Sequence, residues 1–329
     1  MKIFDRIILK IEALDSDKLL QEDNIDIHIA FGIDANFARG MGVCITSIIL
    51  NNLDKNIAFH VFTDQINQAD IEKLKELTQY KNVKIKIYYI DSKVFKTLPT
   101  TMAWSQAIYY RFIMGKVLYG IVDKVLYLDA DILCIGSLDA LPQVEMKENI
   151  ILAIADHPAG IEEKIKHLSI KNGKYFNSGV MYIDINKWND EKIAEKSLDL
   201  LLKNPEMYQS FDQDVLNVLL DGKTYFISEN WNYIYNLGYM NHELPKGINL
   251  IHFTGDKPWQ RWTEHHFMVK VYEHYIKKSP WCDIPLSEPS HYKEKRRMAK
   301  SYAKRGKYIK AFIWYGKYLC ARTKTKYSK

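Results

Sequence analysis

An apolar segment that ends in two aspartates carries the strongest chemical signal in this chain. The string KVLYLDADILC spans residues 124–134, and its two carboxylates belong to Asp129 and Asp131. Carboxylates separated by one residue repel each other unless a cation lies between them. A hard divalent ion such as Mg²⁺ or Mn²⁺ prefers oxygen ligands of this kind. The spacing alone fits a metal site and, equally well, the plainer alternative of a strand that ends in an acidic turn.

A histidine at the end of a second apolar run could complete such a site. His252 closes the string INLIHF, and TGDKPW follows at residues 254–259. Neutral imidazole is a common metal ligand, Gly255 lets the backbone approach a phosphate closely, and Lys257 could neutralise that phosphate. A histidine alone is more often packed or hydrogen-bonded, so the hypothesis depends on the whole string.

Alternating strands and helices must position these residues. The predicted strands are Ile27–Phe31, Ile57–Thr63, Val83–Tyr88 and Lys124–Leu128, and the predicted helices between them cover Val43–Leu50, Ile71–Leu77 and Ser105–Leu118. This alternation indicates an α/β fold with a mostly parallel sheet flanked by helices. Ligands of such sheets bind at the carboxyl ends of the strands, and Asp129 directly follows Leu128.

The second half of the chain is less regular. Its predicted strands are Ile150–Ala155, Gly179–Ile185, Tyr225–Ile227 and Asn249–Phe253, and its predicted helices are Ile193–Leu202 and Gln213–Leu219. Three prolines between residues 280 and 289 mark a break. The expected organisation is a lead-in at residues 1–24, one α/β domain at residues 25–280 and a basic helical module at residues 281–329.

Composition places the chain among globular proteins. Of its 329 residues, 47% are hydrophobic and 26% are charged, which excludes a disordered or fibrous chain. No long apolar run predicts a transmembrane helix, and the charged first residues do not resemble a secretory signal. The four cysteines are scattered without metal or disulfide spacing, as expected in a reducing cytoplasm.

Positive charge is concentrated at the C-terminus. Residues 291–329 hold 14 Lys/Arg and one acidic residue, whereas the other residues balance to −7. Aromatic residues are interleaved with these charges, which is typical of an interfacial helix on anionic lipid. A solubilising tail and a nucleic-acid-binding tail are the alternatives, and we do not expect nucleic acid. The residues that could share one helix face are Met298, Tyr302, Ile309, Phe312 and Leu319.

Seven strings in order make the chain resemble glycosyltransferase family 8. They are HIAFGIDANF, GVCITSIILNN, LPTTMAWSQAIYYRF, VLYLDADILC, YFNSGVMYIDINKW, FDQDVLNVLL and LIHFTGDKPW. The resemblance covers residues 27–281 and is closest to the lipopolysaccharide core glucosyl- and galactosyltransferases of Gram-negative bacteria. It implies a GT-A nucleotide-sugar-binding fold in the catalytic domain. It also implies retaining, metal-dependent transfer of glucose or galactose from a UDP-sugar to a core sugar. The basic aromatic tail suits an acceptor at the inner face of the cytoplasmic membrane.

The resemblance also implies a role for each matching residue. The metal ligands would be Asp129, Asp131 and His252. The UDP-sugar would be bound by Asp34, Asn36, Arg111, Gly255 and Lys257. The residues that frame the sugar and acceptor would be Asp156, Asn177, Asp212 and Gln213. Without the family, Asp212 would be an ordinary helix N-cap. The chain departs from the family pattern HxxGPxKPW, because only Asp256 separates its glycine from its lysine.

Retention of anomeric configuration leaves two mechanisms open. A covalent intermediate needs a nucleophile, for which Asp212 is chemically better than Gln213. In same-face attack, the departing phosphate accepts the proton of the acceptor, and we favour this route. Rival functions are transfer to a capsule, protein or other glycolipid, non-catalytic binding of a nucleotide sugar, and a Mg²⁺-dependent phosphohydrolase. Leu133 occupies a position where haloacid-dehalogenase-type phosphohydrolases need Thr or Val, which disfavours the last.

Overall fold

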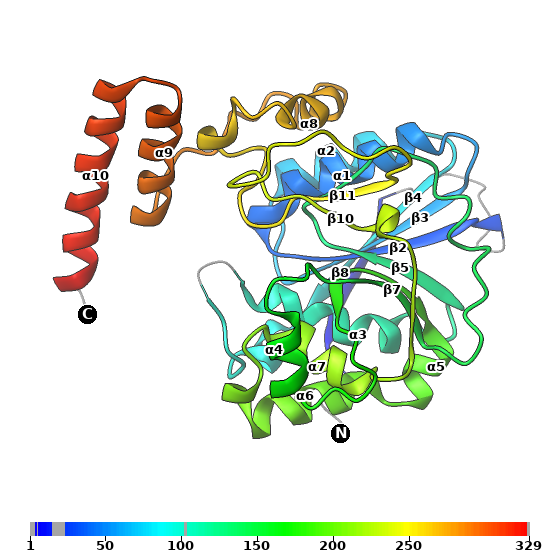
Figure 1. The fold of residues 1–329 in the computed structure, drawn as a ribbon. Helices are drawn as coiled ribbons and strands as arrows, with labels where there is room; N and C mark the ends of the chain where they lie inside the picture. Colours follow the sequence, from blue (N-terminus) through cyan, green and yellow to red (C-terminus); the bar gives the residue numbers. More distant parts are fainter. Residues whose placement is uncertain (1–3, 5, 15–23, 102–103, 328–329) are drawn as a thin grey trace. The chain divides into compact units, whose positions relative to one another are not determined.

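The computed structural model describes residues 4, 6–14, 24–101 and 104–327 (Figure 1). By its contacts the chain divides into two compact units. The first comprises residues 1–234, 245–252 and 279–281, and the second comprises residues 235–244, 253–278 and 282–329. Across the described residues, no helix is both long and apolar enough to cross a membrane.

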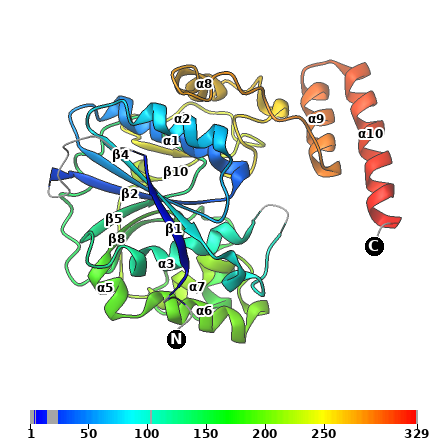
Figure 2. The ribbon, with the colours of Figure 1, turned by 180° about the vertical axis from the view of Figure 1, so that it is seen from behind.

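An eight-stranded sheet, counted over the described residues, lies at the centre of the first unit (Figures 1 and 2). Its order is β1-β4-β3-β2-β5-β8-β7-β9. Strands β4, β3, β2 and β5 are parallel, and β8 then pairs antiparallel with β5. The strands span Ile8–Ala13 (β1), Ile27–Ile33 (β2), Ile57–Thr63 (β3), Val83–Ile90 (β4), Lys124–Leu128 (β5), Ile151–Ala155 (β7), Phe176–Asp184 (β8) and Thr224–Phe226 (β9).

A smaller sheet in the first unit has the order β10-β11-β6 among the described strands. Strand β6 (Ile132–Cys134) follows β5 closely and pairs antiparallel with β11 (Leu250–His252), so that Ile132 lies opposite His252. Strand β10 (Tyr233–Ile234) pairs with the other edge of β11. The small sheet therefore brings the end of a late strand to the segment after β5.

Helices cover both faces of the large sheet (Figure 1). On one face lie α1 (Ala38–Asn51) and α2 (Gln68–Leu77). Trp281 packs against these helices and donates a hydrogen bond from Nε1 to Asp70 of α2 at 2.7 Å. A Cβ atom on Gly42 of α1 would lie 2.3 Å from the Trp281 ring. The main hydrophobic core lies on the other face, beneath helices α3 (Tyr110–Val117), α5 (Ile185–Asp190), α6 (Ile193–Lys203) and α7 (Phe211–Leu219). Helix α4 spans Ile161–His167.

The predicted fold class is confirmed, with a mostly parallel sheet flanked by helices. The structure adds a strand that the sequence analysis did not predict, because β1 lies inside the proposed lead-in of residues 1–24 and pairs antiparallel with β4. It is an edge strand, and most of its side chains are exposed or half-exposed. The remainder of the lead-in at residues 1–3, 5 and 15–23 lies outside the described residues.

The second unit contains α8 (Val269–Ile276), α9 (Tyr292–Lys304) and α10 (Tyr308–Tyr327). A capping box between His291 and Glu294 begins α9, and Gly306, with a φ of +70°, ends the turn between α9 and α10. The predicted single apolar face is therefore wrong, because the basic segment forms two packed helices. Met298 and Tyr318 are buried, whereas Tyr308, Ile309, Phe312, Ile313, Tyr315 and Leu319 are exposed.

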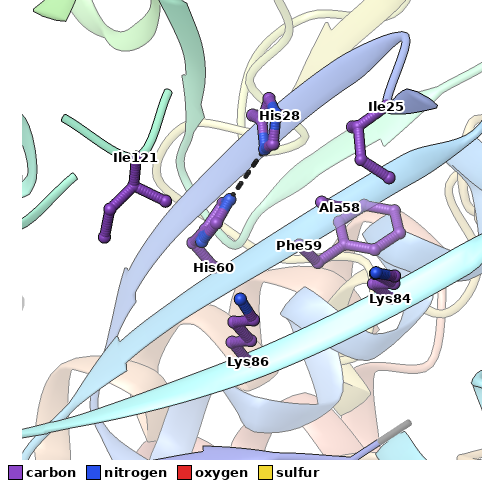
Figure 3. A pocket seen from close by; sticks show the side chains of 8 residues that line it. All are labelled: Ile25, His28, Ala58, Phe59, His60, Lys84, Lys86 and Ile121. Atoms are coloured by element: carbon purple, nitrogen blue, oxygen red, sulfur yellow. Dashed lines mark hydrogen bonds between the residues drawn. The ribbon is translucent and has the colours of Figure 1, made fainter. Parts of the chain in front are cut away.

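A shallow pocket opens at the amino ends of β2, β3 and β4, away from the edge where ligands of such sheets bind (Figure 3). Inside it, His60 Nε2 lies 3.1 Å from His28 Nδ1, and His60 Nδ1 lies 3.0 Å from the Tyr88 hydroxyl. Burial, with the nearby charges of His28 and Lys86, lowers the pKa of His60 to about 3.

His60 should make the protein less stable in acid. The unfolded chain binds a proton at His60 near pH 6.5, whereas the folded protein does so only near pH 3. Acidification from pH 7.5 to pH 5 therefore favours the unfolded state, by about 2 kcal/mol at this residue. Urea unfolding of the wild type and of His60→Gln at both pH values measures this. Equal losses of stability in the two proteins would contradict the prediction.

Candidate functional site

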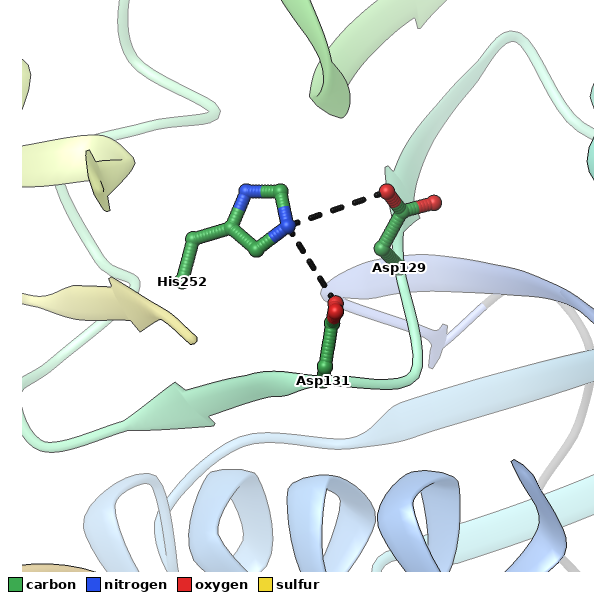
Figure 4. A group of neighbouring side chains, drawn as sticks. All are labelled: Asp129, Asp131 and His252. Carbon is green, nitrogen blue, oxygen red and sulfur yellow. Dashed lines mark ion pairs between the residues drawn. The ribbon is translucent and has the colours of Figure 1, made fainter. Parts of the chain in front are cut away.

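Asp129, Asp131 and His252 come together at the carboxyl end of β5 (Figure 4). The His252 Nε2 atom lies 3.2 Å from Asp131 Oδ1 and 3.9 Å from Asp129 Oδ2. One ligand atom from each residue lies within 4.8 Å of the others, and no other part of the described chain brings together three such groups. The strand order explains the arrangement, because β6 carries the chain from the aspartates directly alongside β11.

Hydrogen bonds fix the orientation of the His252 ring. Asn232 donates from Nδ2 to Asn177 Oδ1 at 2.9 Å, so its Oδ1 is the acceptor that faces His252 Nδ1 at 3.1 Å. Neutral His252 then carries its proton on Nδ1, and the lone pair of Nε2 faces the two carboxylates. Three electron-rich atoms that face one another suit a cation, and this donor set accepts both Mg²⁺ and Mn²⁺.

Arg111 is buried beside this group and is held on all sides. Its guanidinium contacts Asp129 Oδ1 at 2.8 Å and Asp212 Oδ2 at 3.1 Å, and donates to the Ser178 carbonyl at 2.9 Å. Burial lowers the pKa of Arg111, but the two carboxylates raise it more, and the net pKa is above the usual value. The charge is thus fixed in place, and Arg111 is buried rather than at the surface.

Tyr127 completes the surroundings of Asp129. Its hydroxyl donates to Asp129 Oδ1 at 2.6 Å, and the Arg111 guanidinium lies 4.5 Å from the centre of its ring. Burial raises the pKa of Tyr127 well above its usual value, so the hydroxyl keeps its proton. One oxygen of Asp129 is therefore occupied by Tyr127 and Arg111, and the other faces His252.

Asp212 lies in the first turn of α7 and is not its N-cap. The N-cap is Ser210, and its backbone N–H donates to Asp214 Oδ2 at 2.7 Å. Phe211, between them, adopts a φ of +43°, a left-handed backbone that is rare for a large side chain and concentrates at functional sites. Burial raises the pKa of Asp212 to about 6, against the opposing effect of Arg111.

A network of amides and a carboxylate links the remaining predicted residues of the first unit. Asp156 accepts hydrogen bonds from Asn177 Nδ2 at 3.2 Å and from Gln213 Nε2 at 3.0 Å. The Gln213 Oε1 atom accepts from the Ser178 backbone N–H at 3.0 Å. Since Asn177 also accepts from Asn232, this network extends to the His252 ring.

Asp34 and Asn36 lie in the turn after β2, the parallel neighbour of β5. The Asp34 side chain caps a short 3₁₀ helix by accepting from the Asn36 backbone N–H at 2.9 Å. The turn is therefore at the same edge of the sheet as Asp129, which is where the family resemblance expects it. The described contacts of Asp34 also fit an ordinary capped turn.

Gly255 and Lys257 belong to the second unit. Gly255 has a φ of +73°, and Lys257 Nζ donates to the Phe253 carbonyl at 2.8 Å. Asp256, the residue that departs from the family pattern, accepts from Trp262 Nε1 at 3.0 Å and pairs with Arg297 at 2.7 Å. Its negative charge is therefore balanced within the second unit by a residue of α9.

Sequence reasoning missed four residues that shape this site. Tyr127 and Ser178 stood inside quoted strings, but nothing in their spacing assigned them a role. Asn232 carried no signal, because its importance comes only from its contact with His252. Gly179 is required for space, since a Cβ atom there would lie 2.4 Å from His252 Cε1 and 2.8 Å from Asp129 Oδ2.

Comparison with known proteins identifies the family. A model of glycosyl transferase family 8 matches residues 28–263, and a model of the C-terminal region of that family matches residues 268–322. The chain belongs to glycosyltransferase family 8. This membership is inconsistent with the phosphohydrolase alternative. The family 8 assignment predicted from seven short strings is confirmed.

Known relatives of this family 8 chain include lipopolysaccharide transferases. It is 34% identical over 308 residues to lipopolysaccharide 1,2-glucosyltransferase of Escherichia coli K12, with 90% of this chain and 91% of that protein covered. It is 33% identical to lipopolysaccharide 1,3-galactosyltransferase of Salmonella typhimurium LT2, with 95% and 96% covered. The crystal structure of galactosyltransferase LgtC with donor and acceptor sugar analogues matches with a TM-score of 0.67 at 24% identity, covering 77% of this chain and 96% of that one. The last similarity supports the GT-A fold.

Proposed function

We propose that this chain is a retaining hexosyltransferase that moves glucose or galactose from a UDP-sugar to a sugar of the lipopolysaccharide core. The observation that carries the proposal is the direct link between the Asp129–Asp131–His252 group and the buried pair of Arg111 and Asp212. Two of its relatives act on lipopolysaccharide with glucose or galactose, as their names state, and this supports the acceptor class.

Each part of the site serves one requirement of glycosyl transfer. When bound, a divalent ion would offset the negative charge that the departing UDP gains. Arg111 supplies a second positive charge that cannot move away during the reaction, because four partners hold it. The proposed UDP-sugar contacts are Asp34, Asn36, Arg111, Gly255 and Lys257.

The contacts of Asp212 and Gln213 favour same-face attack over a covalent intermediate. Asp212 is 6% exposed and is paired with Arg111, which lowers its nucleophilicity. Gln213 is a weakly nucleophilic amide, and both of its polar atoms are hydrogen-bonded. We propose that these residues, with Asp156 and Asn177, orient the sugar while the departing phosphate takes the proton of the acceptor. Loss of all turnover in Asp212→Ala, together with a trapped glycosyl-enzyme in the wild type, would instead support a covalent route.

UDP release tests the proposed function. UDP-glucose and then UDP-galactose are supplied with truncated lipopolysaccharide core, each with and without Mn²⁺. We expect release from one donor that requires both metal and acceptor. If the lipopolysaccharide core does not increase UDP release but another glycan does, the proposed acceptor is wrong. No metal-dependent release or binding of either UDP-sugar would contradict the donor chemistry itself.

We also propose that residues 281–329 attach the enzyme to an anionic membrane surface. On α10, the exposed Tyr308, Phe312 and Tyr315 form a stripe at helical spacing. Basic residues of the same helix accompany this stripe, and each basic residue near an anionic surface contributes roughly 1 kcal/mol. Such a surface would keep the enzyme close to a lipid-linked acceptor.

Sedimentation with vesicles should separate this proposal from its rivals. We expect binding to phosphatidylglycerol-containing vesicles but not to pure phosphatidylcholine, and release by salt. The double variant Ile309→Ser/Phe312→Ser should weaken binding at least about tenfold, because it removes two exposed apolar side chains. Leu53→Ser, an exposed position of the first unit, is the control. Binding to DNA at moderate salt with no binding to vesicles would favour the nucleic-acid alternative.

A further inference from the structure

Trp104 carries an exposed indole, and its backbone is hydrogen-bonded to Thr101. Trp104 is 45% exposed, which is unusual for a residue with the largest apolar side chain. The Trp104 backbone N–H donates to Thr101 Oγ1 at 3.1 Å, and the Thr101 backbone N–H donates to the Trp104 carbonyl at 2.9 Å. Ser105 then caps the short 3₁₀ helix Gln106–Tyr109 that leads into α3. The indole is thus exposed although its backbone is held in place.

A second aromatic residue contacts Trp104 from a distant part of the sequence. The rings of Trp104 and Phe211 meet edge to face, with centroids 5.6 Å apart and an interplanar angle of 81°. Phe211 is the residue with the left-handed backbone, and it immediately precedes Asp212. One residue therefore has both the strained backbone and the ring that contacts the indole.

The two segments that carry this aromatic pair also carry the central ion pair of the site. The segment of Trp104 continues into α3, where Arg111 lies, and the segment of Phe211 continues into Asp212. Arg111 and Asp212 contact each other at 3.1 Å, and consecutive Cα atoms are about 3.8 Å apart. The Phe211 backbone therefore directly adjoins that of Asp212, whose carboxylate is buried, whereas Trp104, which contacts the Phe211 ring, is exposed.

We propose that Trp104 and Phe211 form a binding platform for the sugar ring of the acceptor. The proposal rests on the proposed function, because it assigns the second substrate of the same site. The anionic UDP-sugar is assigned in the proposed function to Arg111 and to the ion that Asp129, Asp131 and His252 would hold. The acceptor must enter from solvent, and an aromatic face suits the apolar C–H face of a pyranose ring, while nearby polar side chains bind its hydroxyls. Trp104 is the exposed aromatic feature that adjoins the site through Phe211.

Kinetics with truncated lipopolysaccharide core as the acceptor test this role. We expect Trp104→Ala to raise the KM for the acceptor about tenfold. The KM for the UDP-sugar should not change. Trp104→Phe, which keeps an aromatic ring, should have a smaller effect. Tyr119→Ala removes an aromatic residue that is 54% exposed elsewhere in the first unit and should change neither KM. Equal increases in both KM values for Trp104→Ala would overturn the proposal.

A binding measurement keeps this inference separate from the proposed function. Protein labelled with 5-fluorotryptophan gives a ¹⁹F signal for Trp104 that is identified by its absence in Trp104→Phe. Core oligosaccharide, and methyl glucoside or galactoside at millimolar concentration, should shift that signal selectively. If UDP-sugar binds in the presence of metal but no sugar shifts the signal, the platform is wrong and the donor chemistry stands. If sugars shift the signal but neither UDP-sugar binds, the platform stands and the proposed function fails.

Discussion

The variant Asp131→Asn should lose metal-dependent transfer almost completely. The substitution keeps the shape of the side chain but removes one of the two charges that would hold the ion, and we expect UDP release to fall about 10³-fold. Asp131 is the better choice than Asp129, because Asp129 also binds Tyr127 and Arg111. A direct readout is the gain in stability on adding Mn²⁺, which is about 2.7 kcal/mol at one hundred times the dissociation constant.

Stability without metal makes this test specific. Because Asp129 and Asp131 repel each other when no ion is bound, Asp131→Asn should unfold at the same temperature as the wild type or higher in the presence of a chelator. Asp139→Asn changes an exposed aspartate that pairs with Lys55 at 2.8 Å and should keep the Mn²⁺ response. If Mn²⁺ stabilises Asp131→Asn as much as it stabilises the wild type, Asp131 is not a metal ligand.

Replacing Arg111 with methionine should destabilise the folded protein strongly at neutral pH. The change keeps much of the side-chain volume but leaves Asp129 and the buried Asp212 without their shared positive partner. Breaking a buried pair from one side costs about 3 kcal/mol or more. Urea unfolding at pH 7.5 measures this loss. UDP release should also fall, by about 10²-fold or more, since a fixed charge near the leaving group is lost.

The loss of stability in Arg111→Met should depend on pH in a definite direction. Removal of the guanidinium raises the pKa of Asp212 further above about 6. The folded variant then takes up a proton that the unfolded chain does not bind until lower pH. The deficit relative to the wild type should therefore shrink at pH 5, and Asp212→Asn added to Arg111→Met should recover part of it at pH 7.5. Lys203→Met breaks an exposed pair with Asp199 and should cost under about 0.5 kcal/mol.

The sheet and the cluster of Asp129, Asp131 and His252 could be predicted because their signals are local. Strands β3 and β5 have the predicted bounds, since both are continuous buried runs bounded by polar turns. Asp129 and Asp131 follow such a run directly, so the carboxyl end of the strand fixes their place. Family resemblance, rather than spacing, selected Asp156, Asn177 and Gln213, and the structure does bring them into one network.

The features that escaped prediction depend on contacts between distant residues or on weak local patterns. Strand β1 has mostly exposed or half-exposed side chains, as edge strands do, so its hydrophobic pattern is faint. The role of Asn232 exists only because β11 brings His252 to it. The two-helix form of the basic segment depends on the left-handed Gly306, one residue within a long run of helix-forming residues. A prediction from hydrophobic periodicity alone therefore placed residues on both sides of Gly306 on a single helix face.

Gly179 narrows the routes by which this site could change during evolution. Any side chain there would overlap both His252 and Asp129, and neither can retreat, because Asn232 holds the first and Arg111 with Tyr127 holds the second. A randomised library at position 179 that is selected for activity should return glycine alone. A descendant enzyme could change its sugar preference through substitutions at exposed positions such as Trp104, whereas position 179 must remain glycine.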